Sequence, residues 1–340
     1  MQNYAPYKEL LKSSTYEVLQ KANDFSDNLL SKASHIIDEY FVINKLKKED
    51  FCFVVIGSLG RFEALESSDI DLIPVCISDL DSFLPHDKPL RQYLEHGLEV
   101  HVSEGHDLTK AISITDLLKA ENIGGEDDSS ETLTKRILIL TEGVQVYGEF
   151  PLHEVQRKIM ELYADSECTR GRHILSLCND IVRYYRTLCI EYKAKIDIHD
   201  KGWGSRNMKL RHSRKMWYFS CIMCIVFKAN EHHSDTDKYK ESLLDLFKVN
   251  PISRILQSIN DENRITVGEI LYYYTTFLNF MSSHENRKHL DSIDHSHRYD
   301  QGSLFTEVKL NSDLLHLKIR ELIFHLPPTI LQKVFDWFLL

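Results

Sequence analysis

The sequence has no long hydrophobic run, no excess of positive charge and no low-complexity tract. No stretch of its 340 residues approaches the roughly eighteen apolar residues of a membrane-spanning helix. The start, MQNYAPYKELLKSS, lacks the basic end and unbroken apolar core of a signal peptide. A formal net charge of −10 argues against non-specific attraction to nucleic acid or to an anionic membrane. These absences predict a cytoplasmic protein with no membrane partner and no strong nucleic-acid signature.

The cysteines also lack the pattern of a disulfide framework. There are seven of them, an odd number, and most lie within apolar runs, where reduced thiols pack as small hydrophobic side chains. Cys221 and Cys224 have the spacing of half a zinc site or of a redox pair, but the surrounding MWYFSCIMCIVF is continuously apolar. This setting favours two core residues on a buried helix.

The length and the order of patterns predict two domains of the α+β class. We expect residues 1–150 to form a small mixed β-sheet flanked by helices, including an N-terminal helix over 5–46. Residues 151–340 read as an α-helical domain, because apolar positions recur there every three or four residues. Hydrophobic residues make up 43% of the chain and charged residues 27%, as in ordinary folded proteins.

Three strands are predicted in the first domain. Residues 51–56 are apolar without alternation, which indicates a strand buried on both faces. A second strand covers 70–75, and Pro74 is expected to place its end at a sheet edge or bulge. The third covers 98–102, with Glu99 on the face opposite to the apolar side chains.

The predicted helices of the second domain follow one another with short connections. A long amphipathic helix begins near Ile174, and the remaining helices are expected at 209–228, 236–247, 251–260, 266–282, 304–324 and 328–339. The polar segment 283–303 carries four histidines together with Asp291 and Asp294, a composition that could bind zinc, but its spacing matches no finger pattern and predicts a flexible loop. The glycine-rich, acidic stretch 124–130 is expected to be a surface loop or an interrupted helix start.

The residues after the first strand have the chemistry of a phosphate and metal site. Gly57 and Ser58 form a small-residue turn that lets backbone amides approach a phosphate, and Arg61 could add a forked cationic contact. Asp69 and Asp71 are separated by one residue, so on a strand both carboxylates project from the same face.

Two carboxylates on one face are the ligands of a hard cation. Mg²⁺ prefers oxygen ligands and leaves part of its coordination shell to substrate phosphates. Two such ions, with Mn²⁺ as a substitute, can activate an attacking hydroxyl and neutralise a departing pyrophosphate. A third carboxylate from a neighbouring strand usually completes the arrangement, and Glu99 is the candidate.

A basic run in the second domain suits a triphosphate. Between Arg206 and Lys215 there are five basic residues and no acid, in a chain that is acidic overall. We expect Arg206, Lys209 and Arg214 to bind the nucleotide, because a cleft for a triphosphate needs concentrated positive charge. The same wall could include Arg183, Arg186 and Lys193; the alternative is a solvated charged face.

The opening motif resembles the signature of the polymerase-beta-type nucleotidyltransferase superfamily. Within it, the closest resemblance is to the branch that contains the catalytic domain of the protein-PII uridylyltransferases. The residues that carry the resemblance are Gly57-Ser58, Gly60-Arg61, Glu63 and Ser68-Asp69-Ile70-Asp71-Leu72, with Phe62 where many relatives have a second glycine. Further blocks resemble the same branch: GLEVH at 97–101, RILIL at 136–140, VYG at 146–148, RYYR at 183–186, and the stretch from Trp203 to Lys215.

The resemblance implies a nucleotidyltransferase with a helical substrate-binding domain. Such an enzyme moves a nucleoside monophosphate from a nucleoside triphosphate to an acceptor hydroxyl, which could belong to a protein, a nucleic-acid end or a metabolite. Two alternatives remain open. Arg206 and His212 could serve a helical ribonuclease or a toxin–antitoxin component, or the chain could sense nucleotides without catalysis.

Overall fold

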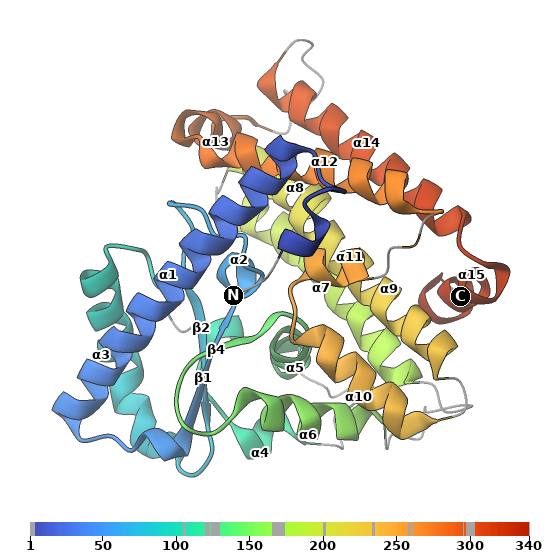
Figure 1. Cartoon of the computed structure of the whole chain (residues 1–340). Coiled ribbons are helices and arrows are strands. Elements are labelled where there is room, and N and C mark those ends of the chain that lie inside the picture. Colours follow the sequence, from blue (N-terminus) through green and yellow to red (C-terminus); the bar gives the residue numbers. More distant parts are fainter. Residues whose placement is uncertain are drawn as a thin grey trace. The chain divides into compact units, whose positions relative to one another are not determined.

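The computed structural model describes residues 4–104, 107–119, 123, 130–164, 174–199, 202–232, 235–257, 260, 262–294, 296 and 303–339. The fold is α+β, as predicted, with one small mixed sheet and many helices (Figure 1). The chain forms two compact units: unit 1 comprises residues 22–180 and 232–250, and unit 2 comprises residues 2–21, 181–231 and 251–340. The chain therefore passes between units at several points instead of once near residue 150. None of the helices in the described ranges is long and apolar enough to cross a membrane.

Unit 1 contains the sheet and the helices around it. Its elements are α1 (Ser13–Asn44, of which the first residues belong to unit 2), η2 (Lys48–Asp50), β1 (Phe51–Ile56), α2 (Gly57–Gly60), β2 (Asp71–Cys76), α3 (Leu80–Leu98), η3 (Asp107–Thr109), β3 (Ile112–Ser113), α4 (Ile114–Leu117), α5 (Ser130–Glu142), β4 (Val144–Tyr147), α6 (Leu152–Ala164) and α10 (Thr236–Phe247). The helix α6, expected to open the second domain, belongs to this unit.

The sheet has the strand order β3-β2-β1-β4. The central strand β1 pairs antiparallel with β2 and β4, and β2 pairs parallel with β3. All six residues of β1 are buried, which confirms the predicted strand covered on both faces. This burial follows from its position between two strands and two layers of side chains.

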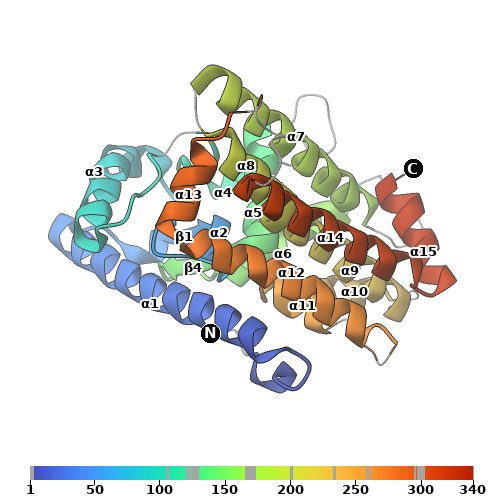
Figure 2. The ribbon, with the colours of Figure 1, turned by 90° about the horizontal axis from the view of Figure 1, so that it is seen from above.

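Alternate residues of β1 belong to different layers. Phe51, Phe53 and Val55 join a core with Phe41 of α1 and Phe83 of α3. Figure 2 shows α1 and α3 side by side. The aromatic rings of this core meet edge to face or tilted, for example Phe41 and Phe53 with centroids 5.5 Å apart.

The opposite face of β1 carries Cys52, Val54 and Ile56 and is also fully covered. A Cβ added to Gly143, just after α5, would lie 2.9 Å from Cγ1 of Val54, so the end of α5 packs closely on this face. The sheet is therefore a middle layer between the α1–α3 pair and α5.

Two expectations about strands in unit 1 were wrong. The predicted strand 98–102 is the end of α3 followed by a single bridge between Ile70 and Val102. Five alternating residues are too few to outweigh the pattern that continues α3 to Leu98. Pro74 is not in an edge strand, since β2 has neighbours on both sides, but pairing with β3 begins only at Val75, so no ladder bond requires a proline N–H.

All regular elements of unit 2 in the described residues are helices. Its elements are η1 (Ala5–Tyr7), most of α7 (Leu175–His199), α8 (Trp203–Lys209), the π-helical turn η5 (Leu210–Arg214), α9 (Lys215–Glu231), α11 (Pro251–Gln257), α12 (Arg264–Ser282), α13 (His284–Asp291), α14 (Leu304–Phe324), α15 (Pro328–Val334) and η7 (Phe335–Leu339). The helices α12 and α14 lie side by side (Figure 2).

The helical predictions hold for most of the second half. The bounds of α10 and α14 coincide with the predicted ones, and Cys221 and Cys224 are buried free thiols within α9. The flexible loop expected over 283–303 begins instead as α13, whose first turn is capped by the Ser283 hydroxyl. His295 and His297, and residues 124–129, lie outside the described residues.

Candidate functional site

The glycine turn after β1 and the aspartate at the start of β2 share one small space. Gly57 has a φ of +74°, and a Cβ at this position would lie 2.7 Å from Oδ2 of Asp71. Ile56 and Asp71 are opposite each other in the antiparallel β1–β2 pair, which brings the end of one strand to the start of the next. The backbone of the turn is therefore open toward a carboxylate, as glycine alone allows.

Asp69 and Asp71 flank Ile70 at the start of β2. Ile70 between them is buried in the core below α1 and α3, whereas Asp69 is exposed and Asp71 is half-buried. Asp69 precedes β2 and Asp71 begins it, so the alternation of a strand, continued back to Asp69, would place both carboxylates on the side opposite to Ile70. The metal-binding role of the pair stays a prediction.

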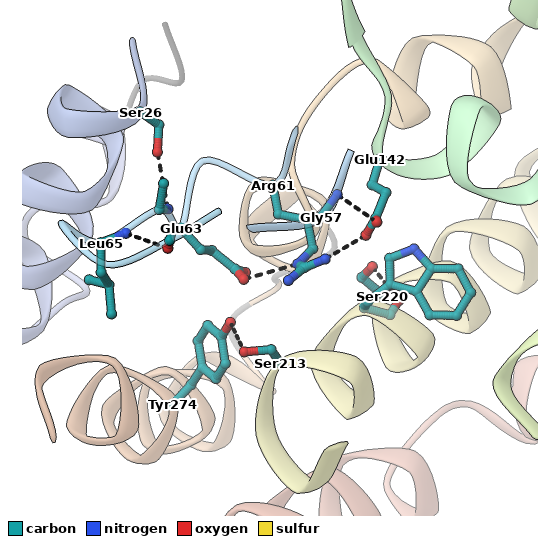
Figure 3. A network of polar contacts seen from close by, with 12 residues as sticks. Ser26, Gly57, Arg61, Glu63, Leu65, Glu142, Ser213, Ser220 and Tyr274 are labelled. Atoms are coloured by element: carbon teal, nitrogen blue, oxygen red, sulfur yellow. Dashed lines mark hydrogen bonds and ion pairs between the residues drawn. The ribbon is translucent and has the colours of Figure 1, made fainter. Parts of the chain in front are cut away.

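Arg61 is connected to the turn through the carboxylate of Glu142. Its Nε donates to Glu63 at 3.0 Å and its Nη1 donates to Glu142 at 2.7 Å, while the second oxygen of Glu142 accepts the Gly57 amide at 3.0 Å (Figure 3). The Arg61 side chain is 4% exposed, and Glu142 is fully buried. The forked contact that the sequence suggested for a phosphate is thus made with carboxylates of the protein itself.

The loop beyond Arg61 has an unusual backbone. Phe62 has a φ of +59°, in the left-handed region that glycine adopts more readily than a bulky residue. Its ring is buried, and its amide donates to Leu59. The chain then returns through Ala64, whose amide donates to the Ser26 hydroxyl of α1. The burial of the Phe62 ring offsets the cost of its backbone conformation.

The segment beside the aspartates is held by Arg91. Ile70 donates to the His101 carbonyl at 2.9 Å, and Ser103 donates to the Ile70 carbonyl at 3.0 Å. The Arg91 guanidinium donates to the carbonyls of Leu72 at 3.2 Å, Ser103 at 2.9 Å and Thr109 at 2.7 Å. Arg91 thus supplies N–H donors to these backbone carbonyls, as a neighbouring strand would.

Arg91 is also a buried cation whose charge influences the site. Burial lowers its pKa, and the neighbouring carboxylates of Asp87 and Asp71 oppose this shift. Asp87 lies four residues earlier on α3 and accepts from Nε at 2.8 Å. The charges of Arg91 and Asp71 therefore attract each other within the fold.

Glu99 does not lie beside the two aspartates as a strand residue. It is exposed and ends α3 in a left-handed conformation with a φ of +54°. By the parallel register of Ile70 with Val102, the positions on the aspartate face are His101 and Ser103. Within the described ranges, no group of three His, Cys, Asp or Glu side chains is arranged to hold a metal ion.

The predicted basic residues belong to unit 2. Lys209 and Arg186 are exposed, and Arg183, Arg206 and Arg214 are half-buried. Arg206 donates to the carbonyl of Gly202 at 3.5 Å across one turn of α8. For Lys193 the structure describes only the backbone, as part of α7.

His212, the histidine of the ribonuclease alternative, is a core residue. Its Nδ1 donates to the Met208 carbonyl at 2.9 Å, its Nε2 accepts from Asn311 at 3.1 Å, and its ring stacks on Phe277 with centroids 4.0 Å apart. Burial lowers its pKa to about 3. A neutral, fully engaged imidazole gives no support to acid–base catalysis on RNA.

Sequence reasoning missed Glu142 and Arg91. Glu142 carried a signal, since an acid at the end of a helix opposes the helix dipole and needs a nearby cation or N–H group. Arg91 carried only its spacing of four from Asp87, which many surface helices share. Both act through contacts with residues far away in the sequence.

The two aspartates fit a magnesium ion that is completed by substrate. Mg²⁺ is commonly held by one or two carboxylates together with phosphate oxygens and water. Asp69 and Asp71 would hold it, and the missing side chain of Gly57 lets the turn lie close to the Asp71 carboxylate. In comparisons with known proteins, no protein-family model matches the sequence, and no curated protein matches it significantly.

Proposed function

We propose that this protein is a Mg²⁺-dependent nucleotidyltransferase. An acceptor hydroxyl attacks the α-phosphorus of a nucleoside triphosphate, the bond from that phosphorus to the β-bridging oxygen breaks, and pyrophosphate leaves. The hydroxyl proton passes to an aspartate or to solvent. The observation that carries the proposal is the space shared by Gly57 and the Asp71 carboxylate, where close backbone approach and a metal-binding oxygen coincide.

Each residue has a role in this proposal. Asp69 and Asp71 bind Mg²⁺, for which Mn²⁺ substitutes, and the ion supplies charge neutralisation at the phosphates; a second ion would take most of its ligands from the substrate. The Gly57 amide is bonded to Glu142, so in this proposal Ser58 offers backbone to the triphosphate and the missing side chain of Gly57 keeps the turn close to Asp71. Arg61 supports this turn through Glu142.

The basic residues of the helical unit act on the nucleotide. Arg206, Lys209 and Arg214 contribute positive charge for the triphosphate. The resemblance to protein uridylyltransferases makes a protein hydroxyl the first acceptor to test, followed by nucleic-acid ends and small metabolites.

The test is transfer of label from each α-labelled nucleoside triphosphate. Purified protein is incubated with Mg²⁺ and a cell extract, in parallel with the Asp69→Asn/Asp71→Asn double variant. We expect label to reach an acceptor with the wild type, to be lost with the double variant and to persist with Mn²⁺. Because asparagine keeps the size but removes the charge, the loss would report metal binding.

The matched control is Asp81→Asn, which removes an exposed carboxylate from the first turn of α3. This variant should transfer label as the wild type does. Transfer that survives in the double variant would refute the assigned metal ligands. Absence of both transfer and Mg²⁺-dependent nucleotide binding in the wild type would refute the proposed function.

A second candidate function is nucleotide binding without transfer. The observation in its favour is that His101 and Ser103, and no acid, occupy the positions beside the aspartates in the segment paired with Ile70. Calorimetry that detects Mg²⁺-dependent binding of a nucleoside triphosphate, combined with no transfer to any acceptor, would favour this candidate.

A further inference from the structure

A second group of charged residues lies wholly within unit 2, where η5 and the start of α9 meet α14. Two contacts set the alignment of these helices: Asn311 donates to Nε2 of His212 at 3.1 Å, and Arg211 pairs with Asp313 at 3.2 Å. Lys215 comes one turn after Arg211, and His316 comes one turn after Asp313. Lys215 and His316 therefore each lie one turn beyond the Arg211–Asp313 ion pair on their own helix.

Electrostatic influences agree with this alignment. Burial lowers the pKa of His316. The charges of Lys215, Arg320 and Arg211 lower it further, whereas Asp313 raises it. Arg320 lies one turn beyond His316 on α14. We call Arg211, Lys215, His316 and Arg320 the α14 basic cluster.

The cluster has more cations than the protein neutralises. Its one acid, Asp313, already pairs with Arg211 at 3.2 Å and with Lys309 at 2.8 Å. In the part of the chain that the structure describes, no carboxylate forms an ion pair with Lys215, His316 or Arg320. A surplus of positive charge on two adjoining helices attracts an anion.

Lys215 has a lowered pKa because of its burial and its cationic neighbour. It is half-buried, and burial together with the Arg211 charge lowers its pKa to about 8, while Asp313 opposes the shift. A cation held in a partly desolvated position interacts with a bound anion more strongly than a fully solvated one does. Arginine adds donors in a fork that matches phosphate oxygens.

From this arrangement we propose that Arg211, Lys215, His316 and Arg320 form a binding site for a phosphate group. The ligand class is a phosphate dianion, either free as phosphate or polyphosphate or carried by a nucleotide. The site lies in unit 2, and it does not depend on Asp69 and Asp71 of unit 1. It therefore stands whether or not the transfer reaction does.

The first test is calorimetric titration of the full chain with phosphate, tripolyphosphate and ATP in the presence of EDTA. EDTA removes divalent ions, so the aspartate site does not contribute. Arg320→Gln and Lys215→Gln should each weaken binding about tenfold, the worth of one charge-assisted contact. Arg320 is exposed, so its variant should fold normally even if Lys215→Gln does not.

Matched controls come from α10. Lys240 has a side chain that is 23% exposed and pairs with Asp237, so Lys240→Gln removes a comparable lysine elsewhere and should leave binding unchanged.

A variant of the opposite sign is Asp313→Asn, which removes the one acid of the cluster and should tighten binding several-fold. Its control, Asp237→Asn on α10, should have no effect.

The outcomes separate the possible sources of the phosphate. Tighter binding of ATP than of tripolyphosphate, lost in Arg320→Gln, assigns the site to a nucleotide; equal binding assigns it to the phosphates alone. The proposal is overturned if none of the ligands binds the wild type at millimolar concentration. It is also overturned if the ligands bind Arg320→Gln as tightly as the wild type.

A second readout follows the His316 ring by NMR. A bound phosphate should raise the pKa of His316 against the charges of Lys215, Arg211 and Arg320, in the direction that Asp313 already pulls it. A His316 titration curve that is unchanged at saturating phosphate contradicts the proposed site.

Discussion

At the scale of single residues, Gly57 occupies the most constrained position of the candidate site. Its φ is positive, and a side chain would approach Asp71 to 2.7 Å. We expect Gly57→Ala to lower the free energy of unfolding by about 1–2 kcal/mol. An alanine is strained in the left-handed backbone conformation, and its Cβ would clash with the Asp71 carboxylate. Urea denaturation measures the change.

Gly268 is the matched control for this substitution. It lies within α12, and an added Cβ would meet only the Leu10 carbonyl, 3.9 Å away. Gly268→Ala should stabilise the protein by up to about 1 kcal/mol, because alanine favours a helix over glycine. A Gly57→Ala protein as stable as Gly268→Ala would contradict the described turn.

His212 makes the stability of the protein depend on pH. In the folded protein its pKa is lowered to about 3, whereas in the unfolded chain it is near 6.5. As the pH falls, the unfolded chain therefore takes up the proton first. The contribution of this buried neutral ring is complete above pH 6.5 and is lost as the pH falls toward 3, by at most about 1.4 kcal/mol per pH unit.

The measurement is the free energy of unfolding between pH 7 and pH 5. We expect His212→Gln to be less stable at pH 7 but to lose less stability on acidification than the wild type. His153→Gln, at an exposed histidine on α6 with a 55% exposed side chain, should keep the wild-type slope. Equal slopes for all three proteins would rule out the assigned role of His212.

At the scale of elements, Arg91 joins α3 to two segments that no regular ladder holds beside β2. Arg91→Lys keeps the charge but loses the fork that reaches Leu72, Ser103 and Thr109. We expect the amides of Ile70 and Ser103 to exchange with solvent about tenfold faster or more, measured by hydrogen exchange.

Arg157→Lys is the matched control, because Arg157 pairs with Glu154 on the surface of α6 with a 46% exposed side chain. Its exchange pattern should match the wild type. Unchanged protection of Ile70 and Ser103 in Arg91→Lys would show that the bridge to Val102 stands without the arginine.

Element by element, the fold was predictable where the pattern was long. The bounds of α10 and α14 were correct because each presents several turns of one amphipathic face, and β1 was correct because it is apolar without a break. The strand at 98–102 failed because alternation over five residues cannot be distinguished from a helix end. Hence Asp71 lies in the predicted strand, at the start of β2, whereas Glu99 ends α3 instead of lying in a strand.

At the scale of the whole molecule, both units contain buried free cysteines. Burial raises the pKa of Cys52 and Cys76 to about 12 and that of Cys224 to about 11, and it raises the pKa of Cys178 as well. Since the thiolate is the nucleophile, these four should react slowly with iodoacetamide at pH 7.5.

Mass-spectrometric mapping of the alkylated cysteines tests this expectation. Cys189 is half-buried and should be modified before the other four in the native protein, whereas all should react alike in urea. Fast native labelling of Cys178 or Cys224 would contradict the burial described for α7 or α9.

The sequence by itself determined the α+β class, the buried strand β1 and the pair of aspartates, because these depend on neighbouring residues and on the period of a strand or helix. Only the tertiary structure decided which side chains serve the candidate site. Arg61 turns inward because Glu142, 81 residues later, meets it there, and Arg91 replaces a missing strand. The division into units that exchange segments was equally hidden, since packing between distant segments leaves no local pattern.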